Sequence, residues 1–439
     1  MRRVSFLAIL RHAAYVLYNH LWYSVAMLGF LKGRLFFVRI CLLTGVLTLV
    51  AVGILTIYAV GYPAEKAPGA GPTDLEGYWR KQVVFAVMGF ACFALANVVS
   101  YRRLGTLSCW IFAFVLVLLA YLLVSRYIIG LPFAPENEHG AHRWLVFHPR
   151  LPRIQPSEFC KLAYIVALAW YLRYRSNYRR FSSLVGPFAL TVLPMVMILI
   201  EPDLGTVLLM MPVLFAMLFV AGAKLKHLGI VVLMAAALSP LMWVKMESYQ
   251  RVRISSVLLQ SPWLRNVAER NSTVGRILVG GSFSTRRWRN DWGYHIIRSK
   301  CAIASGGLTG FGFRRGPFIT YDFLPERHND FIFSAIAHQW GLLGCVGLLA
   351  VYVVVFACGF EIAANNTDPF GRLIAIGITV MFIVQVLVNV GMTLGLMPIT
   401  GLTLPFVSYG GSSLLVSLTA VGLLNNVGRH WPFSVARKN

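Results

Sequence analysis

The stretch VRICLLTGVLTLVAVGILTIYAVG, residues 38–61, contains a single charged residue, Arg39. A helix of this length reaches across the roughly 30 Å hydrocarbon core of a bilayer, because each helical residue adds about 1.5 Å. The apolar residues follow one another without alternating, which is typical of a membrane-spanning helix and not of a barrel strand. This stretch therefore predicts the first transmembrane helix.

Nine more runs of the same kind follow along the chain. We predict an all-α, polytopic membrane protein with ten transmembrane helices and a large outer loop, residues 245–330, between helices 7 and 8. The nine runs lie at 83–99, 107–125, 159–173, 184–200, 204–222, 227–244, 331–357, 372–395 and 411–428.

The composition excludes a soluble protein. Of the 439 residues, 58% are hydrophobic and 13% are charged, and the mean hydropathy is +0.68, whereas a soluble domain has about 25% charged residues. The net charge of +24 therefore suits anionic lipid headgroups or a phosphate-bearing substrate, and we expect no nucleic-acid partner. The seven cysteines form no CxxC pair, so neither a disulfide framework nor a cysteine metal site is predicted.

Basic residues of the short connections orient the helices. They share one side if both termini are cytoplasmic, as the positive-inside rule requires. These residues are Arg2, Arg3, Arg11, Lys32, Arg34, Arg102, Arg103, Arg173, Arg175, Arg179, Arg180, Lys224, Lys226, Arg429, Arg437 and Lys438. We predict a cytoplasmic or interfacial segment at 1–37, with an amphipathic helix over 4–31, a membrane domain at 38–428 and a cytoplasmic tail at 429–439.

Acidic residues gather on the opposite side in this topology. Only Glu361 and Asp368 of the sixteen face the cytoplasm, so any carboxylate chemistry is expected on the outer face. The 245–330 loop is basic, with fourteen Lys and Arg against six Asp and Glu, but loops beyond about 60 residues are exempt from the charge rule. We expect this loop to form a partly folded cap.

A first polar segment lies at the start of the fourth run. It consists of Arg143 and the sequence Gln155-Pro156-Ser157-Glu158, followed by Lys161. Proline in the first turn and an acidic residue after it favour a helix N-terminus, and Glu158 and Lys161 share a helix face. Either the pair fixes helix packing, or Arg143 and Lys161 help to hold an anionic substrate.

A second segment, Glu201-Pro202-Asp203-Leu204-Gly205-Thr206, breaks the chain between two runs. Carboxylates at a membrane boundary must be solvated or paired. Asp203 fits the N-cap of the following helix; the alternative is contact with a substrate.

A third segment carries Asp291 shortly before Arg298 and Lys300. A carboxylate beside cations suits a general base near a pyrophosphate. The glycines at 306–312 lack the GxxxxGK[ST] pattern, so a nucleotide site is not predicted.

A fourth segment, residues 397–413, is rich in proline and glycine and includes Ser408, Gly410 and Ser412. Its small residues favour close backbone packing, or else they line a polar cavity.

Six segments in this order resemble the SEDS family, which contains the RodA and FtsW proteins. They are QPSE at 155–158, PDLGT at 202–206, GYHII at 293–297, SGGLTGFG at 305–312, LPERHNDFIF at 324–333 and LPFVSYGGSS at 404–413. The resemblance is closer to the elongation branch, RodA. It implies a ten-span peptidoglycan glycosyltransferase of the bacterial inner membrane, acting on lipid II at the outer face beside a class B penicillin-binding protein transpeptidase.

The resemblance also implies roles for individual residues. Asp291 would be the general base that deprotonates a glycan hydroxyl. A divalent cation, Mg²⁺ or Mn²⁺, bound at Asp291 would be the one cofactor. The cations for the departing undecaprenyl pyrophosphate would be Arg143, Lys161, Arg298 and Lys300. The other residues expected to contact substrate are Glu158, Asp203, Ser408, Gly410 and Ser412.

The sequence departs from the family pattern at three places. Asp291 stands three residues before Tyr294, where the family usually has five. Glu201 stands where glutamine is common, and His338-Gln339 stands where two glutamates are common. A lipid II flippase and an inactive scaffold that activates a transpeptidase are the alternative functions.

Overall fold

The computed structural model describes residues 35–64, 75–128, 130, 132–134, 143–146, 153–174, 181–246 and 248–430. Within these ranges the secondary structure is helical, apart from one isolated antiparallel bridge between Leu145 and Ile154. The all-α prediction is therefore confirmed for this part of the chain. The interfacial helix predicted over 4–31 and most of the tail lie outside the described residues.

Each of the ten predicted runs forms one helix. Their bounds are α2 (Phe36–Gly61), α3 (Tyr78–Val98), α4 (Tyr101–Tyr127), α5 (Pro156–Leu172), α6 (Val185–Ile200), α7 (Leu204–Val220), α8 (Leu225–Lys245), α15 (Ile332–Ala364), α16 (Pro369–Thr393) and α17 (Gly411–Arg429). Among the described residues, six are long and apolar enough to cross a membrane: α2, α3, α4, α15, α16 and α17. The chain is thus a polytopic membrane protein.

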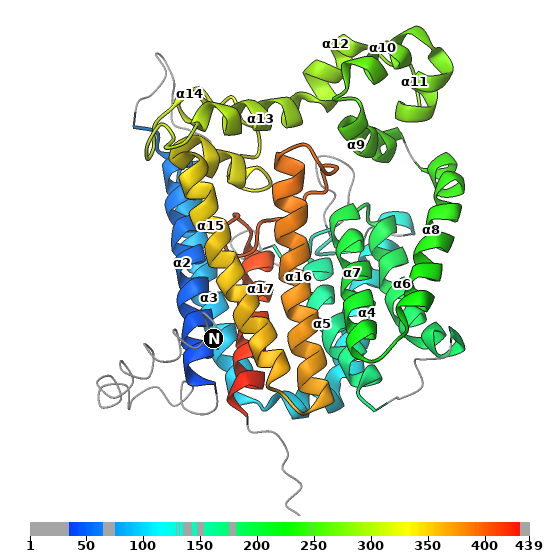
Figure 1. The fold of residues 1–439 in the computed structure, drawn as a ribbon, viewed down its shortest axis with the longest axis vertical. Coiled ribbons are helices and arrows are strands. Elements are labelled where there is room, and N and C mark those ends of the chain that lie inside the picture. Colours follow the sequence, from blue (N-terminus) through cyan, green and yellow to red (C-terminus); the bar gives the residue numbers. More distant parts are fainter. Residues whose placement is uncertain are drawn as a thin grey trace, which may run out of the picture.

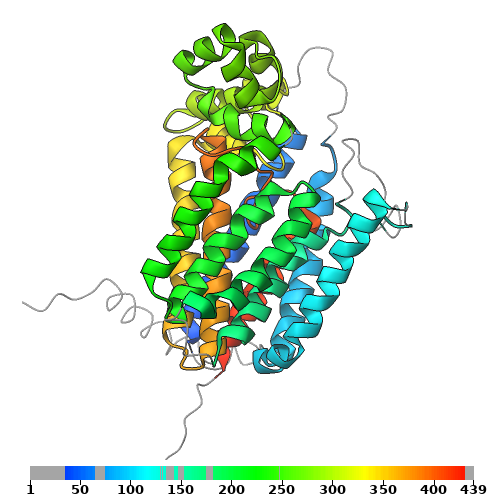
Figure 2. The ribbon, with the colours of Figure 1, turned by 90° about the vertical axis from the view of Figure 1, so that its right-hand side faces the viewer.

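These helices form one bundle (Figures 1 and 2). α17 packs mainly against α3, α15 against α2, and α5 against α4, while α16 contacts both α15 and α7. α5 is buried on nearly all sides, whereas only a minority of the residues of α3 and α4 are buried. Exposed apolar faces on the outer helices of a bundle are what a lipid environment requires, because lipid tails solvate them.

The predicted cap over residues 245–330 is a set of short helices above one end of the bundle (Figure 1). They are α9 (Ser248–Leu258), α10 (Pro262–Arg270), α11 (Ser272–Val279), α12 (Thr285–Arg287), the π-helical turn η3 (Trp288–Trp292), α13 (Tyr294–Gly306) and α14 (Pro317–Thr320). A small core of Leu259, Ala268, Val279 and Trp288 holds the cap together.

Glycines allow the cap to lie close to α15. A Cβ on Gly306 of α13 would lie 2.0 Å from the carbonyl oxygen of Ala337, so only glycine fits this crossing. α15 itself is interrupted at Gly341, which has a φ of 64°. Hydrogen bonds from Ser299 Oγ to Thr393 O (2.7 Å) and between Ser299 and Ser334 (2.6 Å) fix α13 to α15 and α16.

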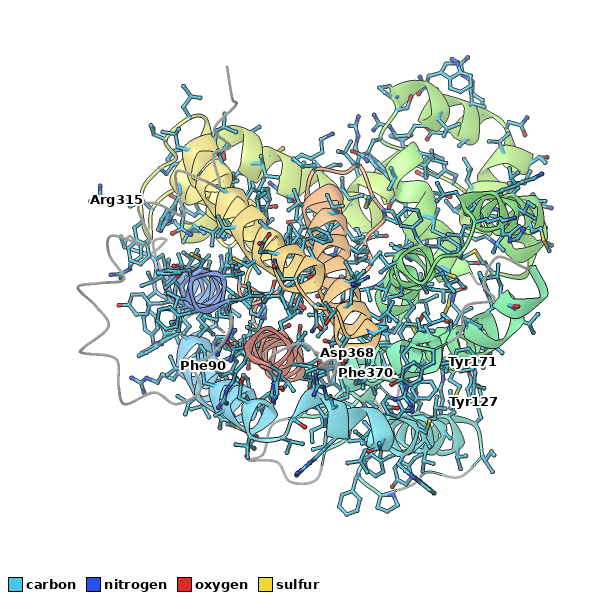
Figure 3. All side chains as sticks on the ribbon, turned by 60° about the horizontal axis from the view of Figure 1, so that its bottom comes forward. Phe90, Tyr127, Tyr171, Arg315, Asp368 and Phe370 are labelled. Carbon is cyan, nitrogen blue, oxygen red and sulfur yellow. The ribbon has the colours of Figure 1, made fainter. Side chains whose placement is uncertain are left out.

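The opposite end of the bundle is closed by polar contacts of its own. Asp368 caps α16 and accepts a hydrogen bond from the Tyr101 hydroxyl at 2.8 Å. Figure 3 shows Asp368 and Phe370 beside each other at this end. Phe370 packs on Trp170 in an edge-to-face contact, so the start of α16 is fixed to α4 and α5.

Candidate active site

Asp203 is the centre of a polar cluster where α5 and α7 begin. As predicted, it is the N-cap of α7, and it accepts hydrogen bonds from the backbone N–H (3.1 Å) and hydroxyl (3.0 Å) of Thr206. Ser157 at the start of α5 donates to the same carboxylate at 2.9 Å, and Gln155 Nε2 lies 3.3 Å away. Four donors therefore surround this carboxylate.

Ser412 joins this cluster from the start of α17. Its hydroxyl accepts a hydrogen bond from the Gln155 backbone N–H and donates to the carbonyl of Arg153, both at 3.1 Å. The first, second and fourth polar segments of the sequence therefore meet at one place, although they are separated by up to about 250 residues.

Arg143 holds the turn between α6 and α7. Its Nε and Nη2 donate to the carbonyls of Glu201 and Pro202 at 2.7 and 2.6 Å. Glu201 is 1% exposed, and burial, followed by the charge of Asp203, raises its pKa to about 9 despite Arg143 and Arg126. At neutral pH this side chain is an uncharged acid, so it resembles the glutamine that is common in the family.

Glu158 and Lys161 form the expected pair on α5. Lys161 Nζ lies 2.7 Å from Glu158 Oε1, and the lysine side chain is 1% exposed. The predicted pairing of these two side chains is thus present, and it balances the charge of Lys161 within the bundle. A direct contact of Lys161 with substrate stays a prediction.

The segment before α17 is bound to the loop before α15. Ser408 Oγ donates to the carbonyl of Asn329 at 2.8 Å, and the backbone N–H of Tyr409 donates to the carbonyl of His328 at 2.9 Å. Gln82 of α3 donates to the Ser408 carbonyl and accepts from the Gly410 N–H. Ser408 and Gly410 therefore shape the backbone of this segment.

Asp330 lies in this loop and was not among the predicted site residues. Burial, followed by the charge of Glu326 and with a further contribution from Asp203, raises its pKa to about 7, against the opposing charge of Arg253 in α9. Its backbone carbonyl accepts a hydrogen bond from Asn389 of α16 at 3.0 Å. In the sequence, Asp330 could have been identified as a candidate site residue because it is the last charged residue before an apolar run.

Asp291 lies in η3, in the cap. Its side chain is 59% exposed, and its carboxylate is 4.0 Å from Arg287 Nε. Arg298 stacks over the rings of Tyr294 and Phe323.

Lys300 donates to Gln260 Oε1 at 3.1 Å. The structure therefore places Asp291, Arg298 and Lys300 in the cap and in α13, and Arg143, Glu158, Lys161, Asp203 and Ser412 in the bundle. Among the described residues, no group of three or more His, Cys, Asp or Glu could hold a metal, so a metal at Asp291 stays a prediction.

Local hydrogen bonds accompany His338 and Gln339, which stand where two glutamates are common in the family. His338 Nδ1 is 2.8 Å from the hydroxyl of Ser305, and Gln339 Oε1 accepts a hydrogen bond from the backbone N–H of Arg314 at 2.9 Å. Neutral hydrogen bonds to the 305–314 segment thus replace the two negative charges.

Comparison with known proteins gives consistent matches. The cell cycle protein family of FtsW, RodA and SpoVE matches residues 39–431. The peptidoglycan glycosyltransferase RodA of Treponema pallidum is 33% identical over 88% of this chain and 96% of its own length. The peptidoglycan glycosyltransferase MrdB of Escherichia coli K12 is 35% identical over 66% of this chain and 72% of its own length.

Two solved structures share the fold. A chain of a peptidoglycan synthase complex, described as coordinating polymerization and crosslinking, has a TM-score of 0.67 at 30% identity and covers 88% of this chain and 96% of its own length. The rod shape determining protein RodA of Thermus thermophilus has a TM-score of 0.59 at 29% identity and covers 88% of this chain and 95% of its own length. The chain therefore belongs to the FtsW, RodA and SpoVE family of cell cycle proteins.

Proposed function

We propose that this protein is a peptidoglycan glycosyltransferase that polymerises lipid II into glycan strands during cell elongation. One observation carries the proposal: four of the six family-like segments are hydrogen-bonded together at the end of the bundle below the cap. Ser412 binds the 155–158 segment, Ser157 binds Asp203, and Ser408 binds the 324–333 loop. Named glycosyltransferases among the relatives support the same reaction.

The proposed topology has ten transmembrane helices in the bacterial inner membrane, with both termini in the cytoplasm. The start of α2 and the end of α17 lie at the end of the bundle opposite the cap (Figure 1). The basic short connections favour the cytoplasm for that end. The cap and the polar cluster around Asp203 then face outward, where the glycan strand is built.

In the proposed reaction, a hydroxyl of the glycan acceptor attacks the anomeric carbon of the lipid-linked donor. The new bond joins this oxygen to the anomeric carbon, the bond to the undecaprenyl pyrophosphate breaks, and the leaving group keeps the electron pair. Asp291 accepts the proton of the hydroxyl; its exposed carboxylate is free to approach a substrate below the cap.

The contacts of the remaining residues assign them either to the pyrophosphate or to the support of the site. Arg298 and Lys300 are the proposed cations for the pyrophosphate. Arg298 stacks on aromatic rings and Lys300 donates to the neutral amide of Gln260, so these contacts do not compensate their positive charges. Arg143 and Asp203 hold the turn that borders the substrate. Glu158, Lys161, Ser408, Gly410 and Ser412 support it from α5 and α17.

A class B penicillin-binding protein is the proposed partner. The similar chain in the peptidoglycan synthase complex supports this, because crosslinking requires a transpeptidase beside the polymerase.

Reconstitution with labelled lipid II tests the proposal. The purified full chain in nonionic detergent is expected to form glycan polymer without another enzyme. Movement of lipid II across vesicle membranes without polymer would favour the flippase. Stimulation of a transpeptidase without polymer would favour the scaffold, and either result contradicts the proposal.

A further inference from the structure

Three buried oxygen atoms near the outer end of α16 have no hydrogen-bond partner. They are Asp330 Oδ1, Asn389 Oδ1 and Thr400 Oγ1. Asn389 is completely buried and Thr400 is 7% exposed. Buried polar atoms without partners are rare in folded proteins, so each of them requires an explanation.

Asn389 links Asp330 to the segment that follows Thr400. Its Nδ2 donates to the carbonyl of Asp330 at 3.0 Å and to the carbonyl of Leu402 at 2.7 Å. Both donors of the amide are used, so only its oxygen is left to bind something else. A Cβ placed on Gly401, the residue after Thr400, would lie 3.6 Å from Asp330 Oδ2, so the backbone of this segment passes close to the Asp330 carboxylate.

Each of the three side chains offers an oxygen lone pair. Together they offer a carboxylate, an amide oxygen and a hydroxyl, and burying an uncompensated charge costs several kcal/mol. Hard cations bind this set of ligands: carboxylate, amide carbonyl and hydroxyl oxygens. The three atoms are buried, so a partner for them would be the size of an ion and not of a sugar.

The surrounding charges favour a cation. Glu326 and Asp203 add negative potential at Asp330, and Arg253 of the cap supplies one positive charge. With Asp330 itself, three carboxylates and one guanidinium therefore contribute to the potential at this place.

We propose that Asp330, Asn389 and Thr400 form a binding site for a hard divalent cation at the outer end of α16, separate from Asp291. The site goes beyond the proposed reaction, because it is defined by binding and needs no turnover. It connects α16 with the loop before α15 and the segment before α17, and both of these segments carry family-like motifs.

Electron paramagnetic resonance of Mn²⁺ with the purified full chain tests the site. Wild type is expected to bind one Mn²⁺ that Mg²⁺ displaces. Thr400→Val removes an oxygen that has no partner and fits the same space, so the fold is retained while Mn²⁺ affinity falls about tenfold or more. Asp330→Asn removes the charged ligand and is expected to weaken binding further, whereas Asp291→Asn leaves it unchanged.

Three results would overturn the site. Wild type could show no saturable Mn²⁺ binding, both Thr400→Val and Asp330→Asn could bind as wild type does, or Asp291→Asn could be the variant that loses the ion. Polymer formation from lipid II is measured on the same samples. A failure of the proposed reaction therefore stays distinct from a failure of the cation site.

Discussion

Replacing Glu201 by glutamine tests the electrostatics of the turn between α6 and α7. Glu201 is 1% exposed, and one of its carboxyl oxygens is buried without a partner. Burial and Asp203 raise its pKa from the ordinary 4.5 to about 9. At pH 7 the side chain is therefore protonated in the folded protein and ionised in the unfolded chain. Taking up this proton costs the folded state about 3 kcal/mol, at about 1.4 kcal/mol for each pKa unit.

The sign of the pH dependence follows from proton counts. Between pH 4.5 and about 9 the folded state binds more protons than the unfolded chain, so the free energy of unfolding falls as the pH rises. Glutamine is neutral throughout and avoids this cost. Glu201→Gln is therefore expected to be more stable than wild type by about 3 kcal/mol at pH 7, and by more at pH 9.

Thermal unfolding followed by tryptophan fluorescence, in detergent at pH 5, 7 and 9, measures this difference. The gap between the Tm values of variant and wild type is expected to widen with pH. Glu269→Gln is the matched control, because hydrogen bonds from Thr285 lower the pKa of this exposed carboxylate. Parallel Tm curves for Glu201→Gln and wild type would refute the reasoning.

Two further substitutions test packing. Lys161→Ala leaves Glu158 without its partner inside the bundle and is expected to lower the free energy of unfolding by about 3–5 kcal/mol. A double variant, Glu158→Gln with Lys161→Met, should recover most of this loss of stability. Equal losses in the single and the double variant would contradict the buried pair. Gly306→Ala drives a methyl group into the Ala337 carbonyl and is expected to lower Tm by several degrees, whereas Gly347→Ala, which meets nothing within 4 Å, leaves Tm unchanged or raises it. A harmless Gly306→Ala would contradict the close crossing of α13 and α15.

Local patterns in the sequence predicted much of this architecture. Hydropathy over about 20 residues located the helices, because each must satisfy its own backbone within the bilayer. The start of α5 at Pro156, the cap on α7 at Asp203 and the pair of Glu158 with Lys161 depend on residues within one helical turn. Such contacts follow from spacing alone.

Contacts between distant segments could not be predicted in this way. Nothing local shows that Arg143 binds the carbonyls of Glu201 and Pro202, or that Arg298 stacks on Phe323. The link between Asp330 and Asn389 joins residues that are 59 positions apart. These contacts arise from how the helices pack, which local sequence patterns do not determine.

Polymerisation by Asp291→Asn tests the central claim most directly. The assay compares wild type, Asp291→Asn and Glu269→Gln, an exposed carboxylate of the same cap, with labelled lipid II and no other enzyme. Loss of a general base lowers rates by about 10²–10⁴-fold, so we expect Asp291→Asn to lose polymer formation to that extent while Glu269→Gln retains it. Equal polymer from wild type and Asp291→Asn would contradict the account.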